Sequence, residues 1–183
     1  CRFNHTRGNG ELWASSRILM ALLAYYEFTG DQEVLDITEN ASSLIMQKYK
    51  DENYFAVTSR GGGVSHGIGF FEILEWLYRI TGNKDYLEFS VKLYKDFNNG
   101  NIRDDDLKTQ KLLDKDQLFE KHGAHIAEGM FVPEYIASIQ KTDKYNKAAD
   151  NAVKKLTQHL TPGGAMRADE WIKARKGTAD ERY

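Results

Sequence analysis

The sequence predicts an all-α protein assembled from helical hairpins, and three observations support this class. Residues 25–36 (YYEFTGDQEVLD) and 77–88 (LYRITGNKDYLE) carry nearly the same pattern about fifty residues apart, and residues 138–149 carry a fainter copy without the glycine. Each copy combines residues that end a helix with residues that begin one. Apolar residues recur at helical spacing on both sides. Internal repetition of this kind is typical of helical-repeat architectures.

Each copy is predicted to be the turn of a hairpin. Gly30 and Gly82 supply the left-handed residue that ends a helix at low steric cost. Asp31, Asn83 and Asp143 then offer a side-chain oxygen to the free amides of the next helix. Because so few residues lie at each junction, the flanking helices must fold back antiparallel.

The helices on the two sides of each turn differ in their apolar pattern. The second and sixth are amphipathic, whereas residues 19–26 (LMALLAYY) and 67–78 (GIGFFEILEWLY) are apolar almost all round, which predicts burial on several sides. The expected helices are Glu11–Phe28, Gln32–Lys48, Gly67–Ile80, Lys84–Phe97, Ala124–Gln140 and Lys144–Leu160.

Alternating buried and half-buried helices predict an inner layer wrapped by an outer one. An α/α toroid of the (α/α)6-barrel type satisfies this pattern, with about three hairpins forming roughly half of the ring, and a solenoid of stacked hairpins also satisfies it. Acidic residues such as Glu11 and Glu72 lie within the inner helices and need either partners or a wet lumen, which favours the toroid. They could equally lie at the edge of the layer. We expect residues 1–183 to form one all-helical domain, a fragment of a larger catalytic toroid.

The bulk composition excludes several functional classes. The chain has 183 residues, of which 41% are hydrophobic and 28% charged, and its net charge is -2 with a pI of about 6.2. This balance gives no electrostatic basis for binding nucleic acid or an anionic membrane, and no apolar run reaches the roughly 20 residues that span a bilayer. Cys1 is the only cysteine, so no internal disulfide is expected. Cellular location and oligomeric state are left open.

The long connections are where functional side chains are expected, because long loops on a rigid scaffold usually carry function. The stretch RGGGVSHG (60–67) resembles a phosphate-binding loop only in its glycines, since it lacks the Walker spacing and a preceding strand. We interpret it instead as a tight turn that directs His66 into a cavity.

The stretch HGAHIAE (122–128) places His122, His125 and Glu128 three residues apart. That spacing is compatible with a metal site on a helix. However, a helix that begins after Gly123 would turn His122 away, so we favour histidines that donate hydrogen bonds at the rim of a cavity.

The stretch GGAMRADEWIKAR (163–175) is the sharpest catalytic candidate. Asp169 and Glu170 directly precede Trp171. A carboxylic acid beside an aromatic wall loses hydration, which raises its pKa towards that of a general acid. The indole ring could also stack on the apolar face of a sugar. The alternative is a charged surface helix with one anchoring Trp.

Four segments in this order resemble the β-L-arabinofuranosidase-like glycosidases, which comprise glycoside hydrolase family 127 and the group called domain of unknown function 1680. They are NGELW with LLAYYEFTGDQEVLD, HGIGFFEILEWLYRITGNKDYLE, HGAHIAEGMFVPEYI, and TPGGAMRADEW with KGTADERY. The resemblance covers essentially the whole chain. It implies an α/α toroid that hydrolyses a glycosidic bond.

The resemblance also implies roles for individual residues. Glu170 falls on the general acid/base, His66 and His125 fall on positions that line the sugar pocket, and Glu11 falls on the start of the first inner helix. One arm of the family holds a cysteine nucleophile on zinc, and we expect those ligands beyond Tyr183 and none among the residues in hand. The predicted substrate-binding residues are therefore His66, His122, His125, Glu11, Asp169 and Trp171.

Two alternatives remain at this point. Unsaturated uronyl hydrolases and sugar epimerases also use α/α toroids, and the histidines at the rim favour the epimerase among these. A non-catalytic helical repeat that binds a protein or a glycan is the alternative from another class. A carbohydrate substrate is expected for both enzymatic hypotheses.

Overall fold

A computed structural model of the chain describes residues 10–56, 62–166 and 169–173. It divides into two compact units, Cys1–Ile102 and Arg103–Tyr183, which we describe in turn. Across the described ranges the regular structure is helical apart from one isolated bridge between Leu160 and Met166, and no helix there is both long and apolar enough to cross a lipid bilayer. The all-α prediction is confirmed. That the whole chain forms one domain stays a prediction.

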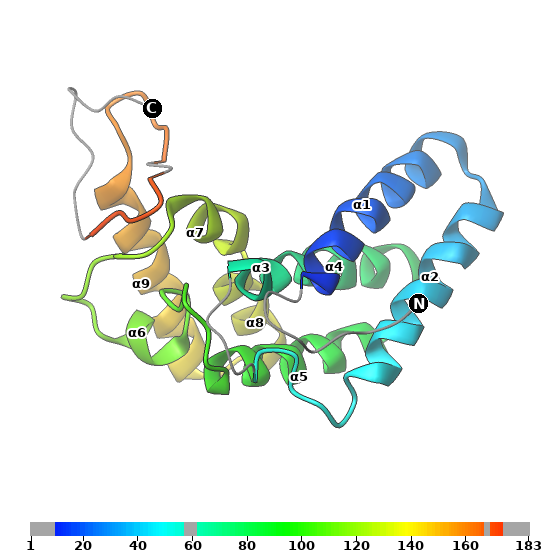
Figure 1. Cartoon of the computed structure of the whole chain (residues 1–183), viewed down its shortest axis with the longest axis horizontal. Coiled ribbons are helices and arrows are strands. Elements are labelled where there is room, and N and C mark those ends of the chain that lie inside the picture. The colour runs from blue at the N-terminus through cyan, green and yellow to red at the C-terminus, as the bar shows by residue number, and fades with distance from the viewer. Residues whose placement is uncertain (1–9, 57–61, 167–168, 174–183) are drawn as a thin grey trace. The chain divides into compact units, whose positions relative to one another are not determined.

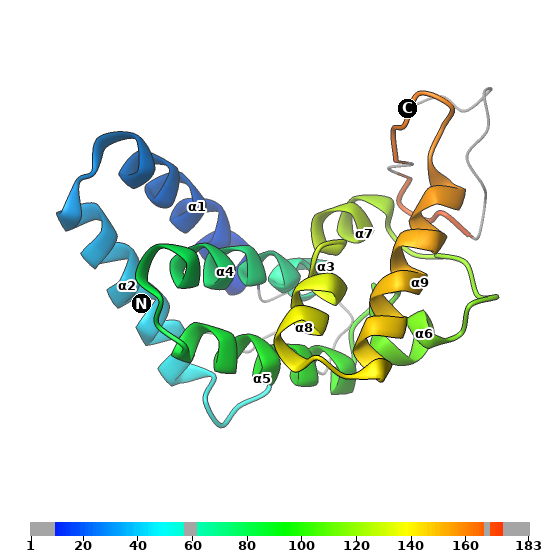
Figure 2. The ribbon, with the colours of Figure 1, turned by 180° about the vertical axis from the view of Figure 1, so that it is seen from behind.

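The first unit consists of two helical hairpins (Figures 1 and 2). In order, its elements are α1 (Glu11–Thr29), α2 (Gln32–Lys48), α3 (Gly62–Ser65), the 3-10 helix η1 (His66–Gly69), α4 (Phe70–Thr81) and α5 (Asp85–Asn99). α1 packs on α2, α4 packs on α5, and α1 also contacts α4 and η1. These antiparallel pairs are those expected of an α/α toroid fragment.

The hairpin turns of this unit form as predicted. Gly30 and Gly82 both have a φ of 71°, and each donates its N–H to the carbonyl four residues earlier. The side chains of Asp31 and Asn83 then accept hydrogen bonds from the amides two residues later, at 3.1 Å and 3.0 Å. At both turns, therefore, a left-handed glycine ends one helix and a side-chain cap begins the next, as the sequence predicts.

The third predicted helix begins differently from the expected Gly67–Ile80. A short α-turn and a 3-10 turn precede α4, and Gly67 lies against the ring of Tyr54. A Cβ at Gly67 would come within 2.4 Å of Cε1 of Tyr54, so only glycine permits this close approach.

The core of the first unit is rich in aromatic residues. Tyr54 packs edge-to-face on Tyr49 and on Phe55, with ring centroids 5.3 Å and 5.0 Å apart, and Phe55 packs in the same way on Phe97 at 5.3 Å. All four side chains are buried. Edge-to-face contacts of this kind add to the free energy gained by burial.

The first helix is less buried than its sequence predicts. Ile18 is 64%, Tyr25 51% and Phe28 91% exposed, whereas α4 buries five large apolar side chains. The reason is that the neighbours of α1 in the described part of this unit, α2, α3, α4 and η1, leave part of its surface open to solvent.

The second unit contains α6 (Thr109–Leu113), α7 (Gly123–Gly129), α8 (Val132–Gln140) and α9 (Asp143–His159). α9 packs on both α8 and α6 (Figure 2). The short α6 was not predicted, and two buried residues of α9 hold its end. Asn151 Nδ2 donates to the carbonyl of Leu112 at 2.9 Å, and Lys155 Nζ donates to that of Lys111 at 2.5 Å.

Two predictions for this unit are wrong in detail. The single helix expected over Ala124–Gln140 is broken into α7 and α8, because Pro133, near the start of α8, has no amide hydrogen to continue the ladder. Thr142 rather than Asp143 caps α9, accepting from the amide of Tyr145. Lys141, with a φ of 49°, takes the left-handed position that glycine holds in the other turns.

Candidate functional site

In the second unit, a short segment is fastened to the start of α7 by main-chain hydrogen bonds. Residues 169–173 lie against residues 120–123, and Ile172 between them is fully buried. The bonds run from Gly123 N to Asp169 O (2.9 Å), from Ile172 N to Lys121 O (3.0 Å) and from Lys173 N to Glu120 O (2.9 Å). Asp169, Glu170 and Trp171 are thereby brought beside His122.

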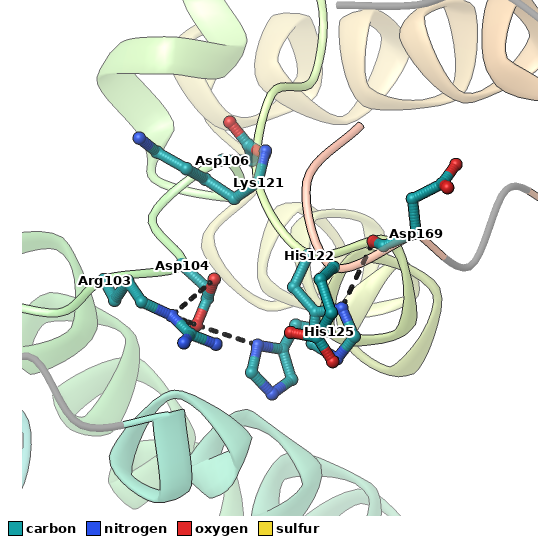
Figure 3. A network of polar contacts seen from close by, with 8 residues as sticks. Arg103, Asp104, Asp106, Lys121, His122, His125 and Asp169 are labelled. Atoms are coloured by element: carbon teal, nitrogen blue, oxygen red, sulfur yellow. Dashed lines mark hydrogen bonds and ion pairs between the residues drawn. The ribbon is translucent and has the colours of Figure 1, made fainter. Parts of the chain in front are cut away.

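The two histidines of HGAHIAE lie together. His122 precedes the first residue of α7, and its ring meets that of His125 edge-on with centroids 4.5 Å apart. Nδ1 of His122 lies 3.3 Å from the carbonyl oxygen of Asp169, and Nε2 lies 3.8 Å from Oε1 of Glu170. The expectation that His122 turns away is wrong, because the carbonyl of Asp169 holds its ring towards α7 (Figure 3).

A buried carboxylate anchors the second histidine. Oδ2 of Asp104 lies 2.9 Å from Nδ1 of His125 and 3.0 Å from Nε of Arg103 (Figure 3). The side chains of Asp104 and His125 are 1% and 4% exposed. Burial alone would raise the pKa of Asp104, but hydrogen bonds and charge from His125 and Arg103 outweigh it and lower that pKa to about 2.

A second buried carboxylate supports the loop before α7. Oδ2 of Asp106 accepts hydrogen bonds from the amides of Glu120 at 3.0 Å and Lys121 at 2.7 Å. Burial raises the pKa of Asp106, and these two amides counteract part of that rise. Asp106 therefore fixes the backbone from which His122 projects.

Trp171 and Glu170 lie at the open side of this group. The ring of Trp171 has two cations over it, the guanidinium of Arg103 at 5.7 Å and Nζ of Lys121 at 5.3 Å from its centroid. The side chain of Glu170 is 73% exposed. The dehydration of Glu170 that Trp171 was expected to cause is absent, because the carboxylate extends into solvent while the indole contacts the two cations.

The other predicted site residues lie in the first unit. Glu11 is in the first turn of α1, and its Oε2 accepts a hydrogen bond from the hydroxyl of buried Tyr49 at 3.0 Å. His66 begins η1, and its ring stacks on that of Trp13 with centroids 3.9 Å apart and planes inclined by 11°. That His66 shares one pocket with His125 and Glu170 stays a prediction.

Sequence reasoning missed several residues that organise these groups. They are Asp104 and Asp106 in the second unit, and Trp13 and Tyr49 in the first. The signal for the acids was present in RDDDLK (103–108), where three acidic residues follow an arginine in a connection between helices. A run of acids is usually a solvated surface, and nothing in the run shows which of its members are buried.

The arrangement in the second unit is suited to proton transfer and to binding hydroxyl groups. A glutamate open to solvent lies beside a histidine, and a second histidine is oriented by a carboxylate. Within the described ranges no group of three His, Cys, Asp or Glu residues could hold a metal ion. The zinc ligands that the resemblance implies were expected beyond Tyr183, and that expectation stays a prediction.

Comparison with known proteins identifies the family. The model of the β-L-arabinofuranosidase GH127 catalytic domain matches residues 2–181. No curated protein and no solved structure is significantly similar to the chain. The match favours hydrolysis over sugar epimerisation and over a non-catalytic repeat, and it makes carbohydrate the class of substrate. The chain belongs to the GH127 β-L-arabinofuranosidase catalytic-domain family of glycoside hydrolases.

Proposed function

We propose that the protein hydrolyses the glycosidic bond of a β-L-arabinofuranoside and that Glu170 is its general acid/base. The observation that carries the assignment is the position of Glu170. Its Oε1 lies 3.8 Å from Nε2 of His122, an ion-pair distance, and its side chain is open to solvent. The family match supports the choice of reaction and sugar.

We assign two proton transfers to Glu170, the first to the substrate and the second from water. The protonated carboxyl gives its proton to the glycosidic oxygen as the bond from that oxygen to the anomeric carbon breaks. The resulting carboxylate then takes a proton from the water whose oxygen bonds to the anomeric carbon, which completes hydrolysis. The exposure of Glu170 suits this role, because the substrate oxygen and the water must both reach the carboxyl group.

His122 and His125 have distinct supporting roles in this proposal. His122 positions the Glu170 carboxylate, and its own ring is held by the carbonyl of Asp169. Oδ2 of Asp104 lies 2.9 Å from Nδ1 of His125 and so orients that ring, to which we assign the binding of a sugar hydroxyl. The carbonyl of Asp169 thus holds the ring of His122, and binding of substrate by its side chain stays a prediction.

Substitution of the acid tests the assignment. Glu170→Gln keeps the shape of the side chain but has no proton to donate, so we expect kcat for a disaccharide that ends in β-L-arabinofuranose to fall about 100-fold or more. An aryl arabinofuranoside with a strongly acidic phenol needs little protonation, so its bond cleavage should be much less affected. The rate of reducing-sugar or phenol release measures both.

Glu134→Gln is the matched control, because Glu134 is an exposed glutamate in the first turn of α8, outside the site. It should leave both rates unchanged. Wild-type turnover of the disaccharide by Glu170→Gln would overturn the assignment of the acid. Isomerised sugar without release of a reducing end would overturn hydrolysis itself.

A further inference from the structure

We propose that Trp13 and His66 form an aromatic platform in the first unit that binds a sugar ring of the substrate. This inference rests on the proposed function, since it assigns a binding surface for the same carbohydrate. It adds Trp13, a residue outside the predicted site, to the groups that contact substrate.

The geometry of the pair leaves part of the indole open. Trp13 lies in the first turn of α1 and His66 at the start of η1, and these two elements pack on one another. The rings are nearly parallel, at 11°, with centroids 3.9 Å apart. His66 therefore covers one face of the indole, while the side chain of Trp13 remains 40% exposed.

The backbone on both sides of the platform is held by burial. Leu12, next to Trp13, is fully buried, and Gly67, next to His66, lies against the buried ring of Tyr54. The main chain that carries both rings is therefore held by the core of the unit. A surface fixed in this way binds a ligand with little loss of conformational entropy.

The three tryptophans differ in how much of their ring surface is open to a sugar. Trp171 has two cations over its ring, and Trp76 donates its indole N–H to Glu27 at 2.6 Å and has the guanidinium of Arg79 over its ring. Within residues 10–56, 62–166 and 169–173, no cation lies over the ring of Trp13.

An open indole face matches the chemistry of a sugar ring. The C–H groups on one side of a sugar form an apolar surface, and an aromatic face binds such a surface through dispersion and the attraction of its π electrons for C–H hydrogens. The imidazole behind the indole extends this surface and keeps the indole plane fixed. A sugar ring without charge is the ligand expected here.

The test measures binding without catalysis. The probes are two disaccharides with a sulfur-linked, uncleavable bond, one ending in β-L-arabinofuranose and one in a pyranose, and calorimetry gives Kd. Trp13→Leu keeps apolar bulk but removes the flat ring, so we expect Kd to rise about threefold to tenfold. Trp13→Phe keeps a ring and should bind within about twofold of wild type.

Tyr25→Leu is the matched control, because it removes another exposed aromatic side chain from α1, near the opposite end of the helix. It should leave Kd unchanged. Thermal denaturation of each variant shows whether the fold is retained. Weaker binding of the pyranose probe alone by Trp13→Leu would support the platform and overturn arabinofuranose as the sugar.

Three results would overturn the platform. They are wild-type Kd in Trp13→Leu, equal weakening in Trp13→Leu and Trp13→Phe, and failure of the folded wild-type protein to bind either probe. The role of Glu170 is judged separately by kcat of Glu170→Gln. If the binding results overturned the platform while Glu170→Gln lost turnover, Glu170 would still be assigned as the acid.

Discussion

The two units hold their functional side chains by different means. In the first unit, Trp13, His66 and Glu11 project from helices whose positions are set by aromatic packing and by hairpin turns. In the second unit, His122, His125 and Glu170 depend on irregular segments that are held by buried carboxylates and main-chain hydrogen bonds. Removal of a charge destabilises a protein strongly where that charge is part of a buried pair, as in the second unit. The two units should therefore respond to different substitutions.

The same difference predicts how the stability of each unit responds to pH and to substitution. Apolar packing in the first unit is insensitive to pH, whereas the network around Asp104 depends on a carboxylate that stays ionised. We expect the first unit to be vulnerable to steric changes and the second to loss of charge. Three substitutions test this comparison.

The largest effect is expected from Asp104→Asn. The variant leaves Arg103 and His125 beside a neutral amide in a buried site, and loss of one partner of a buried ion pair typically costs about 3 kcal/mol or more. Chemical denaturation measures the free energy of unfolding. Asp116→Asn removes the carboxylate from an exposed pair with Lys115 and should cause no measurable change. Similar results for both variants would contradict the importance of the buried network.

The same carboxylate should make stability depend on pH. Its pKa in the folded protein is about 2, below the ordinary 3.8, so the native state binds fewer protons than the unfolded state as the pH falls. The contribution is fully present above about pH 4 and is lost as the pH falls towards about 2, at a cost of about 2 kcal/mol. Asp106 acts in the opposite direction, because burial raises its pKa. Asp104→Asn should therefore unfold less steeply with acid than wild type.

A steric change in the first unit should come next. A Cβ at Gly100 would lie 2.4 Å from Cβ and 2.7 Å from the main-chain oxygen of Phe55, and backbone cannot move aside cheaply. We expect Gly100→Ala to lower the free energy of unfolding by about 2 kcal/mol. Gly163→Ala is the control, since its new methyl group would meet nothing closer than 4.0 Å. Equal stability of the two variants would show that Phe55 relaxes freely.

The smallest effect is expected at the helix caps. Asp31→Ala removes the side-chain oxygen that accepts from an amide of α2, which should cost about 1 kcal/mol. Asp143→Ala should cost less, because Thr142 provides the cap of α9. The midpoint of thermal unfolding compares the two. A larger loss at Asp143 would restore the capping role that its sequence suggested.

Most of the fold was accessible from the sequence because its turns obey local rules. Gly30 and Gly82 end their helices for conformational reasons that do not depend on the rest of the chain, and α2 begins and ends at the predicted residues. The break before α8 was missed although Pro133 was visible, because proline is also compatible with the first turn of a helix. The family resemblance confirmed by the domain match came from the same ordered segments.

The site was accessible only in part. His122, His125, Asp169 and Glu170 were singled out, and the structure brings them together in one unit. Asp104 could not be paired with His125 in advance, because about twenty residues, including the short α6, separate them and no periodic pattern defines their approach. Tertiary pairing of charges is a property of the folded chain rather than of local sequence.

The main-chain attachment of residues 169–173 has a consequence for how this enzyme could change its preference among substrates. The three bonds that fasten the segment use only amides and carbonyls, which every residue except proline supplies in the same way. Side chains at 169 and 171 can therefore be exchanged while these main-chain hydrogen bonds, and with them the position of Glu170, are kept. New substrate preferences could arise there with little loss of stability. A change at the buried carboxylates Asp104 and Asp106 would instead disturb the contacts that hold the site residues in place.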